Sequence, residues 1–237
     1  MLMFGSTTVL NVFTGCGHSN FGFMPEAHGL VGLGGGPLSL ATQLRVHGCL
    51  LDAVLPMGTT WIPLFCTPKI ETYYFVGLSG LGIGDMQLPI PQNSFKRGAI
   101  IDLCTAYTRL PRLVYEAFRN AYLAKIVILP QAPVTSMLDS CYNLSSLESL
   151  EVPNVSFFFL AEPILTLLMW NILVEQEYFA SEGIFCFAFV PTNDTTSVIG
   201  NTQLVGIYTS FDAEVGYVGF GLNICGPLKI SPLCHGH

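Results

Sequence analysis

Residues 100–105 read Ile-Ile-Asp-Leu-Cys-Thr, and this stretch decides the fold that we predict for the chain. The two isoleucines belong to a predicted strand at residues 99–103, and a Pro follows the stretch at position 111. An aspartate between a strand and a helix is usually a cap or a turn residue. Asp102 therefore has a simple structural explanation, against which any catalytic role must be weighed.

The residues around this stretch have the pattern of a protein built from short strands. Residues 73–90 alternate apolar and small side chains, with turns expected at Gly77, Gly80, Gly82 and Gly84, which indicates a β-meander. Beyond Val152, further strands are predicted at residues 155–160, 164–174, 183–190, 197–199, 205–211 and 217–221.

Two helices are expected. Residues 112–126 follow Pro111 and place apolar side chains four apart on one face, at Val114, Phe118, Tyr122 and Ile126. A shorter helix is predicted at residues 37–44, with Pro37 as its first residue.

The composition supports the same fold class. The 237 residues suffice for a large core, and 17 Phe, 24 Gly and 15 Pro favour short strands joined by tight turns. Only 11% of the residues are charged, the net charge is −7, and the sequence contains no run of Lys and Arg. We therefore predict an all-β fold with minor helix and no nucleic-acid partner.

Two segments, one apolar and one rich in glycine, have compositions that also occur in membrane-spanning helices and in nucleotide-binding loops. Residues 163–174 are apolar but shorter than the roughly 20 residues of a membrane-spanning helix, so a buried strand pair is predicted there. Residues 28–40 are rich in glycine, but no Gly-Lys-Ser/Thr follows as in a phosphate-binding loop. We predict no membrane span, no cofactor and no metal.

The cysteines suggest an oxidising compartment. There are eight, none of them in a Cys-x-x-Cys pair, so long-range disulfides are favoured over a zinc site, with free thiols as the alternative.

Three sequons make Asn143, Asn154 and Asn193 candidates for glycosylation. The first residues lack the basic stretch and cleavage site of a signal peptide.

Several segments in a fixed order carry a family resemblance. Residues 102–105 resemble an Asp-Ser-Gly-Thr motif in which Leu103 replaces Ser and Cys104 replaces Gly. Gly29-Leu-Val-Gly-Leu-Gly-Gly-Gly-Pro precedes it, and Asp139-Ser-Cys-Tyr and Ser197-Val-Ile-Gly-Asn-Thr-Gln follow it. The chain thus resembles the plant nepenthesin-like branch of the pepsin-family aspartic peptidases.

The resemblance implies a domain plan and a compartment. Residues 1–70 would be a remnant of the N-terminal peptidase lobe, residues 71–225 a nearly complete C-terminal lobe, and residues 226–237 an unstructured tail. The first catalytic Asp motif of the family is not found in this chain, so we expect an N-terminally truncated member. The family implies secretion or delivery to the vacuole.

The resemblance also implies disulfide pairs. It pairs Cys49 with Cys225 and Cys141 with Cys186, while Cys16 would match a cysteine whose partner lies in the missing region. The remaining three, Cys66, Cys104 and Cys234, match no cysteine of the family pattern.

By the same resemblance, Asp102 is the catalytic aspartate of an acidic-pH endopeptidase that cleaves polypeptides without a cofactor. Such enzymes activate water between two carboxylates, and this chain offers one. Leu103 cannot make the hydrogen bond of the motif's hydroxyl, Cys104 adds a Cβ where strain is expected, and Thr105 retains the ability to bond to Asp102. We therefore predict an inactive chain.

Three alternatives stay open. Two copies could bring two Asp102 carboxylates together, and the oligomeric state is not predicted. The chain could be a fragment of an active enzyme. It could also be a non-catalytic protein-binding module, similar to the plant glycosidase inhibitors that share this fold.

Overall fold

The computed structural model describes residues 2–15, 29–43, 58–65, 72–134, 137–146, 151–176, 183–212 and 215–221. Of the cysteines named above, Cys16, Cys49, Cys66, Cys225 and Cys234 lie outside these ranges, as does the predicted tail at residues 226–237.

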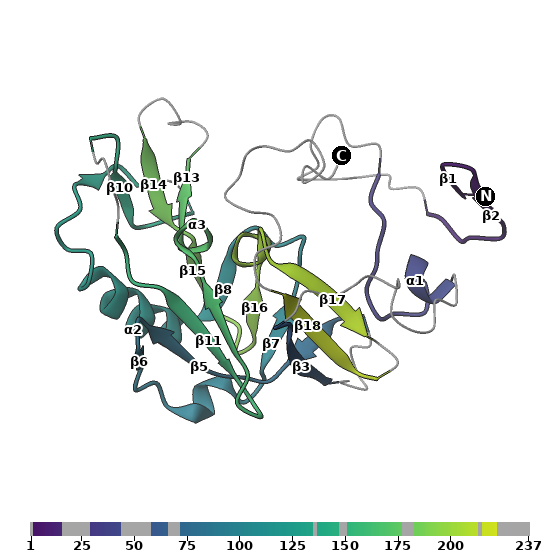
Figure 1. The fold of residues 1–237 in the computed structure, drawn as a ribbon, viewed down its shortest axis with the longest axis horizontal. Coiled ribbons are helices and arrows are strands. Elements are labelled where there is room, and N and C mark those ends of the chain that lie inside the picture. The colour runs from purple at the N-terminus through teal and green to yellow at the C-terminus, as the bar shows by residue number, and fades with distance from the viewer. Residues whose placement is uncertain are drawn as a thin grey trace.

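An eight-stranded mixed sheet forms the centre of the fold (Figure 1). Its strands lie in the order β15 (Phe189–Thr192), β8 (Thr108–Pro111), β16 (Ser197–Ile199), β7 (Ala99–Ile101), β4 (Tyr74–Val76), β3 (Thr60–Phe65), β18 (Tyr217–Gly221) and β17 (Tyr208–Asp212). The pairs β15–β8 and β16–β7 are parallel, and the other neighbours are antiparallel. Because β3 precedes residue 70 and β4 follows it, this sheet joins chain from both sides of the predicted boundary; the boundary itself stays a prediction.

The described part of the chain also contains three smaller antiparallel sheets. One contains β13 (Leu173–Glu175), β14 (Ile184–Phe187), β10 (Cys141–Asn143) and β9 (Gln131–Ala132). Another contains β12 (Ile164–Leu167), β11 (Val155–Phe159), β5 (Leu78–Ile83) and β6 (Met86–Gln87). A hairpin of β1 (Leu2–Phe4) and β2 (Thr7–Val9) lies apart, near the short helix α1 (Figure 1).

Helices are few in the described part of the chain. They are α1 (Leu40–Gln43), α2 (Arg112–Leu123), α3 (Met169–Ile172) and the 3-10 turns η1 (Gln92–Phe95) and η3 (Asn201–Leu204). The prediction of an all-β fold with minor helix is confirmed. Among the described helices, none is both long and apolar enough to cross a bilayer.

Helix α2 closes the core from one side. It begins directly after Pro111, whose fixed φ suits a helix start, and its Val114, Phe118 and Tyr122 are all buried. Phe118 meets Phe187 and Phe189 at ring-centroid distances of 5.4 and 4.9 Å. The predicted apolar face is therefore the packed face, while residues 124–126 form turns after the helix ends at Leu123.

The predicted strand pair in residues 163–174 was wrong in its middle. The structure places the helical turn α3 between β12 and β13. Asn171 explains the turn, because its Oδ1 accepts the Leu168 N–H at 3.3 Å while its Nδ2 donates to the carbonyls of Thr202 and Val205, each at 2.9 Å. Because a buried side-chain amide needs hydrogen-bond partners, Asn171 adopts the helical turn in which it reaches them, although its apolar neighbours have the pattern of a strand.

Other element boundaries also moved. The short helix begins at Leu40 and not at Pro37, because the Ser39 hydroxyl accepts the Thr42 N–H at 3.2 Å in the manner of a helix cap. The strand predicted at residues 183–190 is two strands, interrupted at Ala188. The segment predicted at 205–211 starts only at Tyr208, because η3 and a turn precede it.

The glycines of the meander were partly misassigned. Gly80 and Gly82 lie inside β5 and not at turns, and a Cβ on them would stand 2.4 Å from the Gln87 side chain and 2.7 Å from the Phe158 ring, respectively. Only Gly84, with φ at 58°, makes the tight turn into β6.

The substitution Phe118→Ala tests the packing of α2. It removes a fully buried ring that lies beside three others, those of Tyr122, Phe187 and Phe189, so we expect a loss of about 3–5 kcal/mol in the free energy of unfolding. Urea denaturation of the whole chain measures it. The matched control is Tyr122→Phe, which removes a buried hydroxyl without a partner in the described part of the chain and should cost nothing or stabilise slightly. A loss below about 1 kcal/mol for Phe118→Ala would contradict the packing.

Candidate functional site

Asp102 stands at the end of a strand in the central sheet. It directly follows β7, which pairs in parallel with β16, and its backbone N–H donates to the Ile199 carbonyl at 3.0 Å. The sheet ladder therefore continues one residue beyond the strand and fixes the start of the Asp102 turn.

Both carboxylate oxygens of Asp102 accept hydrogen bonds from the turn that follows. The Cys104 backbone N–H donates to Oδ1 at 2.9 Å, and the Thr105 hydroxyl donates to Oδ2 at 2.8 Å. The Thr105 N–H closes the turn by donating to the Asp102 carbonyl at 3.2 Å. Thr105 thus makes the bond expected of the last motif position, and the carboxylate is oriented by its own loop.

The expectation of backbone strain at Cys104 was wrong. Among the described residues, the non-glycine residues with positive φ are Asn11, Ala161 and Glu162, so Cys104 needs no left-handed conformation. Its thiol is free and exposed, which leaves room for the added Cβ. Leu103 is also half exposed, and its carbonyl accepts the Asn201 side-chain N–H at 3.2 Å.

Gly200 allows two backbone segments to meet beside this turn. A Cβ at position 200 would stand 2.7 Å from the Tyr107 carbonyl carbon, 2.8 Å from the Thr105 oxygen and 2.9 Å from the Thr108 nitrogen. The next two residues, Asn201 and Thr202, donate their N–H groups to the carbonyls of Thr105 and Ala106 at 2.7 and 3.0 Å. Only glycine fits this approach, because all three obstacles are backbone atoms.

A buried glutamine locks the arrangement. Gln203 is fully buried; its Oε1 accepts the Thr108 N–H at 2.9 Å, and its Nε2 donates to the carbonyls of Asn171 and Ala188 at 2.8 and 3.0 Å. Thr108, also buried, accepts the Gly200 N–H on its hydroxyl at 3.0 Å. The sequence alone indicated no role for Gln203, Asn171 or Thr108, although the polar residues Asn201, Thr202 and Gln203 that follow the strand Ser197–Ile199 are a usable signal.

The disulfide lies on a different sheet. Cys141 in β10 and Cys186 in β14 stand directly opposite each other, and their sulfurs are bonded at 1.99 Å. This is a pair that the resemblance implied. It is buried beside Leu138 and Ile184, and it closes a loop of 45 residues, which favours the folded state. The pairing of Cys49 with Cys225 stays a prediction.

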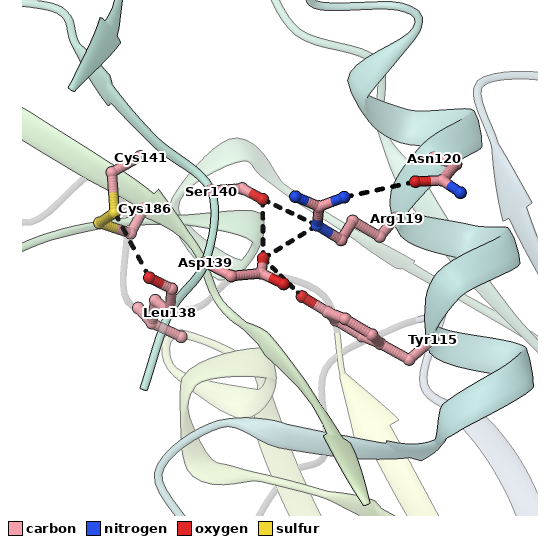
Figure 2. Close-up of polar contacts among 8 residues, drawn as sticks. All are labelled: Tyr115, Arg119, Asn120, Leu138, Asp139, Ser140, Cys141 and Cys186. Atoms are coloured by element: carbon pink, nitrogen blue, oxygen red, sulfur yellow. Dashed lines mark hydrogen bonds and ion pairs between the residues drawn. A yellow bond between two sulfur atoms is a disulfide. The ribbon is translucent and has the colours of Figure 1, made fainter. Parts of the chain in front are cut away.

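A second carboxylate, Asp139, is occupied in holding α2 to that sheet (Figure 2). Its Oδ1 accepts from the Tyr115 hydroxyl at 2.7 Å, from the Ser140 hydroxyl at 2.8 Å and from Arg119 Nε at 2.9 Å. Burial raises the pKa of Asp139, but these hydrogen bonds and the Arg119 charge outweigh it, so the pKa lies below its ordinary value. Burial and the bond to Asp139 raise the pKa of Tyr115. Asp139 is thus an anchoring carboxylate.

The three sequon asparagines have different surroundings. Asn154 and Asn193 are exposed, and Asn193 Oδ1 accepts from Arg112 at 3.4 Å. The Asn143 side chain accepts both the N–H and the hydroxyl of Ser145, at 3.0 and 2.6 Å. Their glycosylation stays a prediction.

Replacing Gly200 tests the site geometry. Gly200→Ala should destabilise the chain by about 1–3 kcal/mol, because the new methyl group meets backbone that cannot move aside. Chemical denaturation measures the loss. Gly32→Ala is the control, since a Cβ there meets nothing within 4 Å and φ is not positive. Equal stability of both variants would refute the close approach.

The Asp139 anchor predicts a pH dependence of stability. Because the folded pKa is lowered, the stabilisation is complete above the unfolded value of about 3.9 and is lost as the pH falls through the folded pKa. Asp139→Asn should cost about 1 kcal/mol at pH 7, a modest amount because the carboxylate is half exposed. Thermal unfolding midpoints between pH 7 and 3 should show this gap closing at acid pH. A constant gap would contradict the assignment; the exposed Asp85→Asn is the control.

Comparisons with known proteins agree with this architecture. Residues 73–221 match the family model described as xylanase inhibitor C-terminal. Protein ASPARTIC PROTEASE IN GUARD CELL 2 of Arabidopsis thaliana is 40% identical over 249 residues, which cover 94% of this chain and 52% of that protein. Nepenthesin-1 of Nepenthes gracilis is 29% identical over 254 residues, which cover 95% of this chain and 56% of that protein. The chain therefore spans about half the length of these relatives.

Solved structures show the same fold. The crystal structure of EDGP matches with a TM-score of 0.69 and 17% identity, covering 83% of this chain and 60% of that one. Conglutin gamma, described as a basic 7S globulin from lupine seeds, matches with a TM-score of 0.68 and 20% identity. The match covers 86% of this chain and 59% of that one. Because the family model matches residues 73–221, which is more than half of the chain, the chain belongs to the plant aspartic protease family that includes the nepenthesins.

Proposed function

We propose that this chain represents the C-terminal half of an aspartic-type endopeptidase, with Asp102 at the position of one catalytic carboxylate, and that the chain alone does not hydrolyse peptides. The observation that carries the proposal is the Asp102 turn. Its carboxylate is oriented by Thr105 and by the Cys104 N–H despite the altered motif.

The chemistry of the family explains the expected inactivity. In aspartic peptidases, two carboxylates about 3 Å apart share one proton, so that one acts as base toward water while the other polarises the substrate carbonyl. The hydrogen bonds around Asp102 come from its own turn, and the Asp139 carboxylate is held by Tyr115 and Arg119 of α2. A single carboxylate cannot supply both roles.

An intact member of the family would cleave polypeptides at acidic pH. Asp102 would contact such a substrate only when a complementary lobe is also present. A secretory or vacuolar destination is supported by the buried disulfide between Cys141 and Cys186, because such bonds persist in oxidising compartments.

A second candidate is a non-catalytic protein-binding module of the glycosidase-inhibitor kind. The family model is named for xylanase inhibitors, and Leu103 and Cys104 stand where the motif has Ser and Gly. Inhibition of xylanases from several families by the purified chain would favour this function. Such inhibition should persist in Asp102→Asn, because binding to a glycosidase requires no carboxylate at position 102.

The deciding experiment is digestion of denatured casein by the purified chain at pH 3–5, with and without pepstatin, beside Asp102→Asn. We expect no cleavage by either protein, because the second carboxylate is lacking. Pepstatin-sensitive cleavage that disappears in Asp102→Asn would overturn the inactivity, and would imply that a second copy supplies the missing group. The variant Leu103→Ser/Cys104→Gly, which restores the motif, should also stay inactive. If this variant cleaved casein, the altered motif, and not the lack of a second carboxylate, would be the cause of the inactivity.

A further inference from the structure

A cavity of about 510 Å³ lies at the far end of the strands that lead to Asp102. Gly98 and Thr196, which line it, directly precede the parallel strands β7 and β16, whereas Asp102 follows β7. The cavity and the Asp102 turn are therefore at opposite ends of the same two strands. This position separates it from the proposed peptidase chemistry.

The walls of the cavity are mainly aromatic and aliphatic. Phe75, Val76 and Phe95 form the buried part, while Phe65 and Leu160 are about half exposed at its mouth. The two mouth residues close over Gly77: a Cβ there would stand 2.7 Å from Leu160 and 3.0 Å from the Phe65 ring. The Leu160 N–H donates to the Gly77 carbonyl at 2.7 Å, which holds this residue in place beside the strand.

Two cations complete the lining. Lys96 and Arg97 line the cavity, and its lining contains no carboxylate. Within the described ranges, the ion pair of the fold joins Arg119 to Asp139, and neither the Lys96 nor the Arg97 side chain has a hydrogen-bond or ionic partner there. Both residues are exposed and, in a protein with a net charge of −7, they place two positive charges on the lining of an apolar cavity.

We propose that this cavity binds a small amphipathic carboxylate, whose aromatic or branched apolar body lies between Phe65, Phe75 and Leu160 and whose carboxylate meets Lys96 and Arg97. Apolar cavities of roughly 300–1,000 Å³ with a few polar groups are typical of small-molecule sites. The charge complementarity selects an anion, and a guanidinium can hold a carboxylate with two hydrogen bonds. An inorganic anion would leave the apolar walls unused.

The binding test uses 2-naphthoate and the full chain, with isothermal titration calorimetry at pH 7 and low salt. We expect saturable binding at one site, and binding about tenfold or more weaker for the neutral 2-naphthamide. The double variant Lys96→Gln/Arg97→Gln should lower the affinity for naphthoate about tenfold or more while leaving that for naphthamide unchanged. Leu160→Ser should weaken both ligands.

Three controls make the result specific. Lys125→Gln removes an exposed cation that does not line the cavity, and Asp102→Asn alters the peptidase turn; both should bind as the unmodified chain does. Arg112→Gln removes a cation from a neighbouring cavity of about 480 Å³ that shares Lys96 and Arg97, and should also leave the affinity unchanged. Equal unfolding midpoints establish that each variant is folded.

The proposal fails on any of three results. Absence of saturable naphthoate binding at millimolar concentration would refute the site. Equal affinity for acid and amide would refute the role of the cations. A loss of binding in Arg112→Gln without a loss in Leu160→Ser would place the ligand in the neighbouring cavity.

Discussion

The approach of two backbones at Gly200 is the constraint on which the Asp102 region depends. A side chain at this position would collide with three backbone atoms of residues 105–108, and the hydrogen bonds of Asn201 and Thr202 require the same closeness. Gln203 then forms hydrogen bonds with backbone groups that are buried nearby, namely the Thr108 N–H and the carbonyls of Asn171 and Ala188. Since buried polar groups without partners are costly, the loop, the glutamine and the α3 turn form one mutually dependent unit.

This dependence explains how the turn keeps its shape although half of its motif has changed. The position of Asp102 is set by the sheet, through Ile199, and its carboxylate is oriented by Thr105 and by a backbone N–H that any residue at position 104 supplies. Leu103 and Cys104 are exposed, so their side chains are accommodated without disturbing the core. The Asp102 turn is therefore ordered by the sheet and by its own backbone, independently of the side chains at positions 103 and 104.

The two ends of β7 have different physical character. At one end, polar backbone groups and a carboxylate are arranged by a network of hydrogen bonds. At the other, aromatic walls and two unpaired cations line a cavity. The strands β7 and β16 lie between the two regions, so a ligand in the cavity would not contact the side chains of the Asp102 turn.

The sequence by itself determined the fold class, the strands at residues 197–199 and 217–221, the start of α2 and its buried face, because periodic apolar side chains and a preceding proline act locally. It also predicted the contact between Thr105 and Asp102, since these residues are the ends of one four-residue turn. The tertiary structure alone decided the α3 turn, the roles of Gln203 and Thr108, and the pairing of Lys96 and Arg97 with an apolar cavity. Each of these brings together residues that are far apart in the chain. Which groups meet is set by how the sheets pack, and no local sequence pattern contains that information.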